Sequence, residues 1–429
     1  MAARRAATIA SRPDASACSR RCSTASPRRA DGGTRLRILH VTPTYLPAVR
    51  YGGTIHAVHG LAKAQAALGH AVEVYTTNVD GPGVTPTPLG ARVDLDGVGV
   101  TYFATGIGRR IYRSPAMGVA LRRHAADFDI LHLHSVYLWP PLAAARIARR
   151  HGAPYVLSPH GMLVASLVRA KSALIKSAWI ALFERRTIRE AAALHLASWR
   201  EADDLRAFRF DLPPLAVIGH GVDAADLRAE QNITGDVAAA ITGGPFVLAF
   251  GRIDWKKNLE ALIEAVALTP DLRCVIAGND EHGRAAELAR LCARLGVSAR
   301  VTIIARQIGE PDRSALYRAC ACLALVSLNE NFGNVALEAM SHGRPVVVSH
   351  TAGVAEAVTG ERAGVVVAPE AGSIARGLAI IAADACAAEE MGARGRVAVE
   401  KRWSWTAVAA EMVAHYEDVL KQSSMRGVP

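Results

Sequence analysis

The segment that joins one buried strand to the next helix reads Asn329-Glu330-Asn331-Phe332-Gly333-Asn334-Val335-Ala336-Leu337-Glu338-Ala339-Met340. The apolar run before it predicts a strand, and the pattern after Gly333 predicts a helix. Glu330 would then lie in the loop before the helix, and Glu338 on its second turn. A helix N-terminus offers unpaired backbone N–H groups and a positive dipole end, both of which suit a phosphate. Spacing alone leaves two interpretations open: a phosphate seat flanked by hydroxyl-binding acids, or an ordinary loop with two exposed acids.

The same order of strand, loop and helix begins both halves of the chain. In the first half, an apolar strand over residues 36–41 precedes a helix from Thr54 and a strand over 71–76. In the second half, strands over 246–250 and 273–278 enclose another helical pattern. Such β-α-β units predict parallel sheets whose ligands lie at the carboxyl ends of the strands. We therefore expect an α/β protein with two Rossmann-like, doubly wound domains facing across a cleft.

These units also set the expected domain limits. We expect a first domain over residues 36–222 and a second domain over 223–403. The polar stretch 226–244 is interpreted as a linker. A helical pattern over 404–421 predicts a C-terminal helix that packs back on the first domain.

Composition limits the class of protein. The 429 residues are 51% apolar and 21% charged, which is a globular profile with room for two or three domains. The cysteines lack a CxxC pair with a distant partner, so neither a disulfide framework nor a zinc site is predicted. No uncharged apolar run reaches the ~18 residues needed to span a bilayer. We expect a cytoplasmic protein.

The positive charge is concentrated at the N-terminus. The formal net charge is +11, and residues 1–35 contribute +6 of it because they hold eight arginines against two aspartates. We interpret this segment as a disordered extension, although its composition also fits a transit peptide or a start codon assigned too far upstream. The rest of the chain is too weakly basic to predict a nucleic-acid partner.

Two cations follow the first strand of the second half. Arg252 and Lys257 lie at the carboxyl end of that strand, and Glu330 follows a later strand of the same predicted sheet. Because these ends share one edge, we expect the cations, the acids and the helix N-terminus to converge there. Two cations beside a helix N-terminus favour a diphosphate over a single carboxylate. They would neutralise a leaving diphosphate without a metal, so no metal site is predicted.

The first half offers two weaker candidates. Gly52-Gly53 precedes the first helix, where glycine lets the backbone approach a ligand closely, although most such pairs are only turns. His160 follows the strand over 154–158 at the carboxyl edge, and His132 and His134 compete for the same role. The Asp94-Leu95-Asp96 triplet is interpreted as a turn rather than a metal site.

Residues 163–191 interleave apolar side chains with Arg169, Lys171, Lys176 and several arginines. A basic amphipathic helix of this kind can lie on an anionic membrane surface. The alternative is a surface helix whose apolar stripe packs on its own domain. The sequence leaves both open.

Together these motifs resemble the retaining GT-B glycosyltransferases of family 4 (glycosyltransferase group 1). Residues 330–338 match the E-x7-E motif of that family, and three further motifs occur in the family's order over residues 36–420. These are Gly52-Gly53, Ser158-Pro159-His160-Gly161-Met162, and Gly251-Arg252 with Lys256-Lys257. The chain departs from the family at Gly219-His220-Gly221, where Pro-Asn-Gly is usual, so the role of that segment stays open.

The resemblance implies a role for each matched residue. Arg252 and Lys257 would hold the donor diphosphate, and Glu338 would bind the ribose hydroxyls. Glu330 would lie against the donor sugar, with His160 near it from the first domain. Two backbone segments would complete the donor site. One is Gly52 and Gly53, of which Gly53 would approach the phosphates closely. The other is Phe332-Gly333-Asn334-Val335, which would complete the phosphate seat. His160, Glu330, Arg252 and Lys257 would be the catalytic residues.

The resemblance also implies substrates. The donor would be a UDP- or GDP-linked hexose, without metal or cofactor. The acceptor would be a glycan or polyprenyl-linked glycan of envelope or exopolysaccharide synthesis, reached from the inner face of the plasma membrane. Within the same fold, a nucleotide-sugar epimerase or a glycosyl phosphorylase would share the crevice. A nicotinamide dehydrogenase is disfavoured because the first loop lacks G-x-G-x-x-G.

Overall fold

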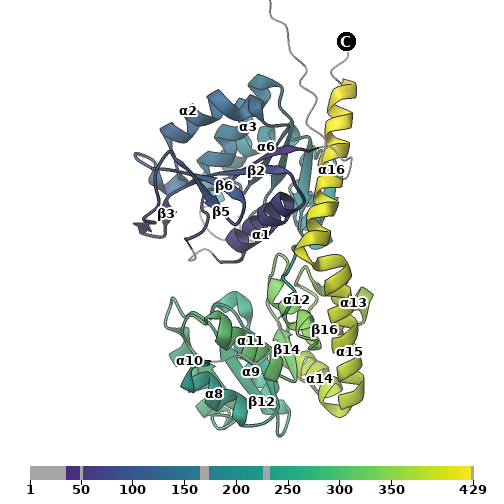
Figure 1. Ribbon diagram of the computed structural model, residues 1–429. Helices are drawn as coiled ribbons and strands as arrows, with labels where there is room; N and C mark the ends of the chain where they lie inside the picture. The colour runs from purple at the N-terminus through teal and green to yellow at the C-terminus, as the bar shows by residue number, and fades with distance from the viewer. Residues whose placement is uncertain (1–34, 49–51, 165–172, 226–231, 427–429) are drawn as a thin grey trace, which may run out of the picture. The chain divides into compact units, whose positions relative to one another are not determined.

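A computed structural model describes residues 35–48, 52–164, 173–225 and 232–426. In the first half, eight strands form a sheet in the order β10-β9-β8-β7-β1-β2-β6-β5, parallel except for β5 (Figure 1). Its strands are β1 (Arg37–Val41), β2 (Ala71–Thr77), β5 (Arg92–Leu95), β6 (Val98–Phe103), β7 (Ile130–His134), β8 (Tyr155–Ser158), β9 (Ala193–Leu196) and β10 (Leu215–Val217). Of the triplet predicted to form a turn, Asp94 and Leu95 end β5 and Asp96 lies in the turn with Gly97, whose N–H donates to Asp94 Oδ1 at 3.1 Å.

Both faces of this sheet are covered, because its central strands bury their side chains on both sides. Leu39, Leu131 and Leu133 pack on the side of the helices α2 (Pro115–His124), α3 (Trp139–His151), α6 (Arg185–Arg189) and α7 (Trp199–Arg206). Ile38 and Ile130 point the other way, towards α1 (Gly53–Ala67) and α16 (Trp405–Arg426). The C-terminal helix therefore contributes to the core of the first half, and Figure 1 shows it running alongside that half.

The second half is a six-stranded parallel sheet in the order β13-β12-β11-β14-β15-β16. Its strands are β11 (Phe246–Phe250), β12 (Arg273–Ala277), β13 (Val301–Ile304), β14 (Cys322–Leu325), β15 (Val346–Ser349) and β16 (Gly364–Val367). The strand order reverses between β11 and β14, which is where a doubly wound sheet opens a crevice for its ligand. The prediction of two Rossmann-like α/β halves is confirmed.

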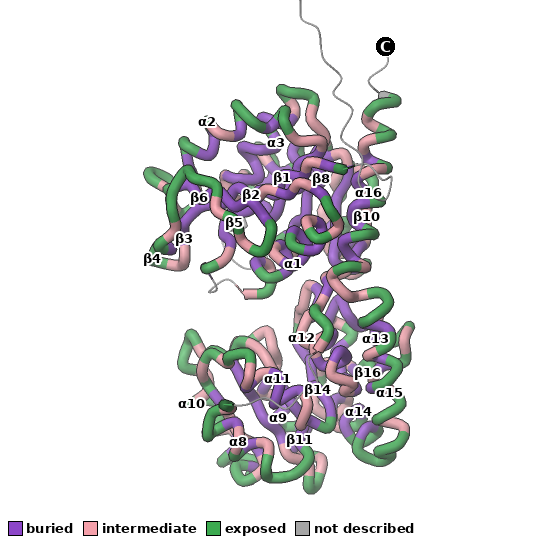
Figure 2. Tube along the Cα trace, in the orientation of Figure 1, coloured by how far each residue is buried: buried purple, intermediate pink, exposed green. Residues whose placement is uncertain are grey.

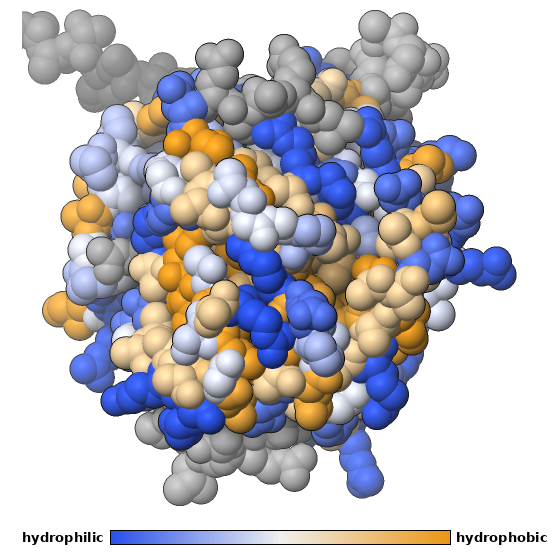
Figure 3. Space-filling view, turned by 90° about the horizontal axis from the view of Figure 1, so that it is seen from below, coloured by the Kyte–Doolittle hydropathy of each residue, from blue (hydrophilic) through white to orange (hydrophobic). Residues whose placement is uncertain are grey.

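Helices cover both faces of the second sheet. They are α8 (Gly235–Thr242), α9 (Leu259–Leu268), α10 (Arg284–Arg294), α11 (Glu310–Ala319), α12 (Asn334–Ser341), α13 (Ala355–Glu361), α14 (Ala371–Ala383) and α15 (Ala385–Ala398). Figure 2 shows that the central strands β11 and β14 are buried, whereas the outer helices α13 and α15 are exposed over much of their length. Seen from below, in Figure 3, hydrophilic and hydrophobic residues alternate over the surface of this half. The buried core of this half is formed by apolar side chains on both faces of its sheet, such as Leu248 on one face and Val247 on the other.

The interpretation of 226–244 as a linker is wrong for much of its described part. Residues 235–242 form α8, and Val237 and Ala240 are fully or almost fully buried in the core of the second half. Polar residues on either side lower the average hydropathy of this stretch, although residues 237–241 are a run of five apolar residues whose Val237 and Ala240 share one helix face. The division at residues 222 and 223 stays a prediction.

The chain passes between the halves twice, and the two crossings are hydrogen-bonded. The Val222 N–H donates to the Trp403 carbonyl at 2.8 Å, and Val222 bridges Ser404. A π-helical turn, Val399–Trp403, precedes α16 at the second crossing.

The amphipathic segment is only partly described, since Arg169 and Lys171 lie outside the described residues. From α5 (Ala173–Trp179) the chain continues through a π-helical turn, Ile180–Glu184, into α6. Ile180 and Ile188 are buried, whereas Leu182 is 69% exposed. In the described ranges no single helix is long and apolar enough to cross a membrane, and only α14 with residues 385–403, bent by 101°, passes that test as a pair.

Candidate functional site

The N-terminus of α12 is held open by a glycine. Gly333 caps the helix with φ +109°, and a Cβ there would lie 2.5 Å from Leu325 Cδ2, so only glycine fits. In the described part of the chain, the N–H groups of Gly333, Asn334 and Val335 make no hydrogen bond. Phe332 turns its side chain into the core, which leaves the backbone to line the loop. The turn can therefore receive an anion at its N–H groups.

The two predicted motifs of the second half meet. Lys257 Nζ lies 2.5 Å from Glu330 Oε2, with 19% and 24% of the two side chains exposed. The Glu330 backbone is held by the loop after β15, since its N–H donates to the Thr351 carbonyl and its carbonyl accepts from Gly353. The prediction that these loops share one edge is thus confirmed by direct contact.

Arg252 lies at the same edge and is exposed. With Lys257 it lines a small cavity of about 10 Å³ at the end of β11. Within the described residues its guanidinium has no hydrogen-bond or ion-pair partner. It is therefore available to an incoming anion, whereas Lys257 is already paired.

Glu338 faces α11 from the second turn of α12. One carboxylate oxygen accepts a hydrogen bond from the Tyr317 hydroxyl at 2.8 Å. Burial and the charge of Glu338 raise the pKa of Tyr317 well above its usual value, so Tyr317 keeps its proton and donates. The carboxylate retains further lone pairs for a hydroxyl-bearing ligand.

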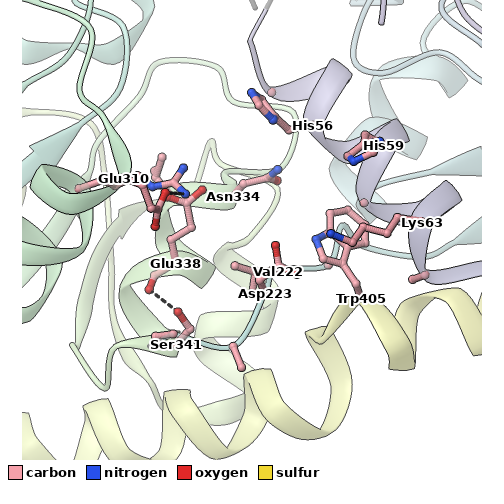
Figure 4. Close-up of a pocket in the computed structure, with 18 of the residues that line it drawn as sticks. His56, His59, Lys63, Val222, Asp223, Glu310, Asn334, Glu338, Ser341 and Trp405 are labelled. Carbon is pink, nitrogen blue, oxygen red and sulfur yellow. Dashed lines mark hydrogen bonds and ion pairs between the residues drawn. The ribbon is translucent and has the colours of Figure 1, made fainter. Parts of the chain in front are cut away.

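Glu338 also lines a pocket of about 740 Å³ between α1, α11, α12 and α16. Figure 4 shows His56, His59 and Lys63 of α1 on one side, and Asn334, Glu338 and Ser341 of α12 on the other. The pocket thus joins groups from both halves of the chain.

Gly52 and Gly53 form part of the wall of this pocket. Gly52 has φ +69°, which favours glycine. A Cβ at Gly53 would meet no protein atom within 4 Å, so nothing in the described chain requires glycine there. This open space fits the predicted approach of a ligand to the backbone, which stays a prediction.

His160 lies at the end of β8 with φ +54°. Its Nε2 is 2.9 Å from His134 Nδ1. Burial, and then the neighbouring imidazoles of His220 and His195, hold its pKa well below the usual value, so the ring is neutral near pH 7. His134 is therefore a hydrogen-bond partner of His160, and the choice among His132, His134 and His160 for the role near the sugar stays a prediction.

Glu201 supports the loop that carries His160. Its two carboxylate oxygens accept from the N–H groups of Gly161 at 2.6 Å and Ala197 at 2.8 Å. Burial raises the pKa of Glu201 to about 7. This residue was missed in the sequence, although Ser198 and Glu201 have the Ser-x-x-Glu spacing of a helix capping box.

His220 occupies the segment whose role was open. Its Nδ1 lies 2.9 Å from Asn334 Oδ1, and its ring packs 5.2 Å from that of Phe332. The segment therefore ties the first half to the start of α12. Arg313 and Tyr317 of the pocket were also missed, although four residues apart on one helix they share a face.

The predicted site residues thus fall into neighbouring groups. Five of them, Gly52, Gly53, Asn334, Val335 and Glu338, line the large pocket, while Arg252, Lys257 and Glu330 gather at the ends of β11 and β14. His160 lines a separate cavity of about 10 Å³ with His220.

One group of described side chains has the spacing of a metal site, namely His40, His132 and His134. Both ring nitrogens of each histidine already have a hydrogen-bond partner in the structure. A metal ion would have to replace those bonds, so the cluster suits a hydrogen-bonded core better than a metal centre.

Comparison with known families gives two matches. A family model described as "Glycosyl transferases group 1" matches residues 236–398, and one described as "Glycosyl transferase 4-like domain" matches residues 52–221. The matched segments contain the two sheets' site loops, from Gly52 to His220 and from Arg252 to Glu338.

Two relatives cover nearly the whole chain. A D-inositol 3-phosphate glycosyltransferase of Kribbella flavida is 30% identical over 418 residues, covering 88% of this chain and 93% of the relative. A GDP-mannose:cellobiosyl-diphosphopolyprenol alpha-mannosyltransferase of Komagataeibacter xylinus is 27% identical, covering 91% and 95%.

Solved structures share the architecture. Sucrose-phosphate synthase from Thermosynechococcus elongatus has a TM-score of 0.70 at 21% identity, covering 90% of this chain and 100% of that chain. HepE of Anabaena in complex with UDP-glucose has a TM-score of 0.68 at 18% identity, covering 90% and 100%. At these identities the likeness shows the fold alone, which is the GT-B arrangement of two Rossmann-like halves.

Proposed function

Because the chain belongs to the group 1 glycosyltransferases, we propose that it transfers a hexose from a nucleoside diphosphate sugar to a glycan or lipid-linked acceptor, with retention as in family 4. The observation that carries the proposal is the contact between Lys257 and Glu330. It brings the basic loop after β11 against the acidic loop after β14, at the point where the strand order reverses. Doubly wound sheets bind nucleotides at such a point.

The cations act on the leaving diphosphate. Negative charge grows on it as the bond to the sugar breaks, and positively charged donors fixed at that place lower the barrier. Arg252 has no competing partner among the described residues, and the N–H groups at the start of α12 add a positive dipole end. Lys257 is neutralised by Glu330 until a diphosphate offers it a stronger negative charge. This arrangement uses no metal.

The remaining groups orient the donor. Glu338, hydrogen-bonded to Tyr317 and facing the large pocket, accepts hydrogen bonds from the ribose hydroxyls. Glu330 and His160 lie against the sugar. In the retaining reaction the acceptor hydroxyl attacks on the face that the diphosphate leaves, and a diphosphate oxygen takes its proton.

The proposed acceptor is inferred from two relatives and from the composition of one segment, rather than from a contact seen in the structure. The Komagataeibacter xylinus relative acts on a glycan carried by diphosphopolyprenol, and the Kribbella flavida relative on an inositol phosphate. We favour a polyprenyl-linked acceptor because residues 163–189 are rich in basic and apolar side chains, and Leu182 is exposed between α5 and α6. The protein would then act in envelope or exopolysaccharide assembly, in the cytoplasm at the inner face of the plasma membrane.

A panel of UDP- and GDP-linked hexoses tests the donor site. A nucleotide sugar that binds the native state alone raises the melting temperature. The donor so identified is then incubated with the protein alone and with polyprenyl-linked glycans. Transfer only in the presence of acceptor, with the anomeric configuration kept, supports the proposal. A change in donor sugar without acceptor would identify an epimerase instead, and inversion at the anomeric carbon would exclude a retaining transferase.

A further inference from the structure

One face of the first sheet buries a row of polar side chains under α1 and α16. His40, His132, Ser158 and His195 lie on neighbouring parallel strands and are at most 6% exposed. The register pairs His40 with His132, and the period of two places them on the same face as the apolar residues that pack on α16. Groups this deeply buried are stable only if they are hydrogen-bonded, and here the bonds form one continuous chain.

The direction of the chain is fixed at one end. His195 Nε2 lies 2.9 Å from the Ile218 carbonyl, which can only accept, so this nitrogen carries the proton. In a neutral ring the other nitrogen, Nδ1, must then accept, and it does so from the Ser158 hydroxyl at 2.8 Å. Ser158 has no second proton, so it accepts in turn from His132 Nε2 at 2.7 Å.

The hydrogen-bonded chain continues to α16 and back to α1. His132 Nδ1 has no proton and accepts from the Tyr416 hydroxyl at 2.6 Å. The Tyr416 oxygen then accepts from the Gln65 amide nitrogen at 3.3 Å. This orients Gln65 so that its amide oxygen accepts from His40 Nε2 at 2.8 Å. His40 Nδ1 is therefore left as an acceptor.

Two further imidazoles bring the chain to the candidate site. His134 Nε2 donates to His40 Nδ1 at 2.9 Å, which leaves His134 Nδ1 as an acceptor. His160 Nε2 donates to it at 2.9 Å. Burial, the first cause in each case, lowers the pKa of His40 to about 4 and of His195 to about 3, and those of the other three histidines fall well below 6.5. All five rings are thus neutral near pH 7, as the chain requires.

We propose that this chain is a positioning device: it holds His160 in the tautomer that is protonated at Nε2, so that Nδ1 can only accept a hydrogen bond. Tyr416 and Gln65 are its positioning residues, because they transmit the orientation between the Ile218 carbonyl and His160. The consequence for transfer rests on the proposed function. His160 would accept a hydrogen bond from a hydroxyl of the donor sugar, and a group that can only accept would not bind to it.

Tautomers can be read without substrate. Proton–nitrogen correlation spectra of the full chain, labelled with nitrogen-15 histidine near neutral pH, show which ring nitrogen carries the proton. The signals of His160 are assigned by their loss in His160→Gln. We expect Nε2–H in the wild type. A wild-type His160 protonated at Nδ1, or charged, would overturn the proposal without any further variant.

Tyr416→Phe tests the transmission. The hydroxyl that holds Gln65 in one orientation is lost, so the amide can turn and reverse the bonds to His160. We expect a second His160 signal with the proton at Nδ1, and a loss of about fivefold in kcat/KM, the effect of one neutral hydrogen bond, at unchanged affinity for the nucleoside diphosphate. Tyr155→Phe is the matched control, since Tyr155 is buried in the same sheet but donates to the Thr187 carbonyl instead. Its His160 signal should equal that of the wild type.

The outcomes separate the two proposals. A Tyr416→Phe spectrum identical to the wild type, or a Tyr155→Phe spectrum changed equally, would refute the positioning role. If the spectra are as expected but no donor is transferred to any acceptor, the proposed function fails and the tautomer assignment stands. If transfer occurs with His160 protonated at Nδ1, only the present inference fails.

Discussion

The ammonium nitrogen of Lys257 lies 2.5 Å from Glu330 Oε2, although 73 positions separate the two residues in the chain. The contact shows that the loops after β11 and β14 reach the same point on the sheet edge. It also shows that each residue is already neutralised by the other. A ligand that binds both side chains must break this ion pair. A diphosphate can do so, because it offers Lys257 a larger negative charge than the Glu330 carboxylate does.

Lys257→Ala should lower turnover by about 10², the usual effect of removing one charged group that stabilises a leaving oxyanion. The measurement is the rate of nucleoside diphosphate release at saturating donor. Lys256→Ala is the control, because Lys256 lies beside the Trp255 ring instead of Glu330. A Lys257→Ala rate within a factor of two of the wild type would show that the diphosphate lies elsewhere.

Glu338→Ala should remove discrimination between ribose and 2′-deoxyribose in the donor. A hydrogen bond from a hydroxyl to a charged carboxylate is worth about 1.5–3 kcal/mol, so the wild type should prefer the ribose donor by roughly 10- to 100-fold in kcat/KM. In the variant the ratio should approach one. Tyr317→Phe keeps the carboxylate and should keep the preference. Equal ratios in wild type and Glu338→Ala would place the ribose away from Glu338.

Stability should fall as the pH drops below 6.5. Burial lowers the pKa of His40 to about 4 and that of His195 to about 3, so between those values and 6.5 the unfolded chain binds protons that the folded chain does not. Each such histidine costs up to about 1.4 kcal/mol per pH unit. Burial raises the pKa of Glu201 to about 7, so between pH 4.5 and 7 the folded chain binds a proton that the unfolded chain does not. The effect of Glu201 on the free energy of unfolding is therefore opposite to that of the histidines, and it offsets the contribution of about one histidine.

Urea unfolding at a series of pH values measures this slope. His195→Gln keeps an amide that can donate to the Ile218 carbonyl but does not titrate, so its slope should be smaller by about 1.4 kcal/mol per pH unit. An unchanged slope in this variant would mean that His195 titrates normally in the folded chain.

Replacing Arg169, Lys171 and Lys176 by glutamine should weaken binding to vesicles with anionic lipid by more than tenfold, since each basic residue near such a surface contributes about 1 kcal/mol. Co-sedimentation at low salt measures it, and vesicles of neutral lipid should bind neither protein. A second variant controls for net charge. It replaces three exposed basic residues outside residues 163–189, namely Arg290, Arg294 and Lys401. Equal loss in both variants would attribute binding to total charge, and no loss in either would contradict a membrane role for residues 163–189.

The meeting of Lys257 with Glu330 could be predicted from the sequence because it follows from topology. Parallel strands place the loops after them on one edge, whatever the side chains between. The contact between Glu338 and Tyr317 could not, since it depends on how α11 packs against α12. Helix α8 was missed because the polar residues around it were given more weight than the short apolar run over residues 237–241, of which Val237, Ala240 and Ile241 pack on the core.

The hydrogen-bonded chain of histidines was the feature that the sequence predicted least well. His132 and His134 were visible as polar residues in an apolar strand, and they were interpreted as rivals of His160. Their true partners depend on strand register and on Tyr416, 284 positions away from His132 on the last helix. A pattern confined to one strand carries no information about such a partner.

In the proposed function, Arg252 and Lys257 form the seat of the donor diphosphate. Calorimetric titration of UDP and GDP into the wild type and Arg252→Ala tests it most directly, because it requires neither the sugar nor the acceptor to be known. We predict that one of the two nucleotides binds the wild type and that Arg252→Ala weakens this binding by about tenfold or more, as expected for the loss of one charged hydrogen bond. Native affinity in Arg252→Ala, or no binding of either nucleotide to the wild type, would show that these two residues do not hold a donor diphosphate.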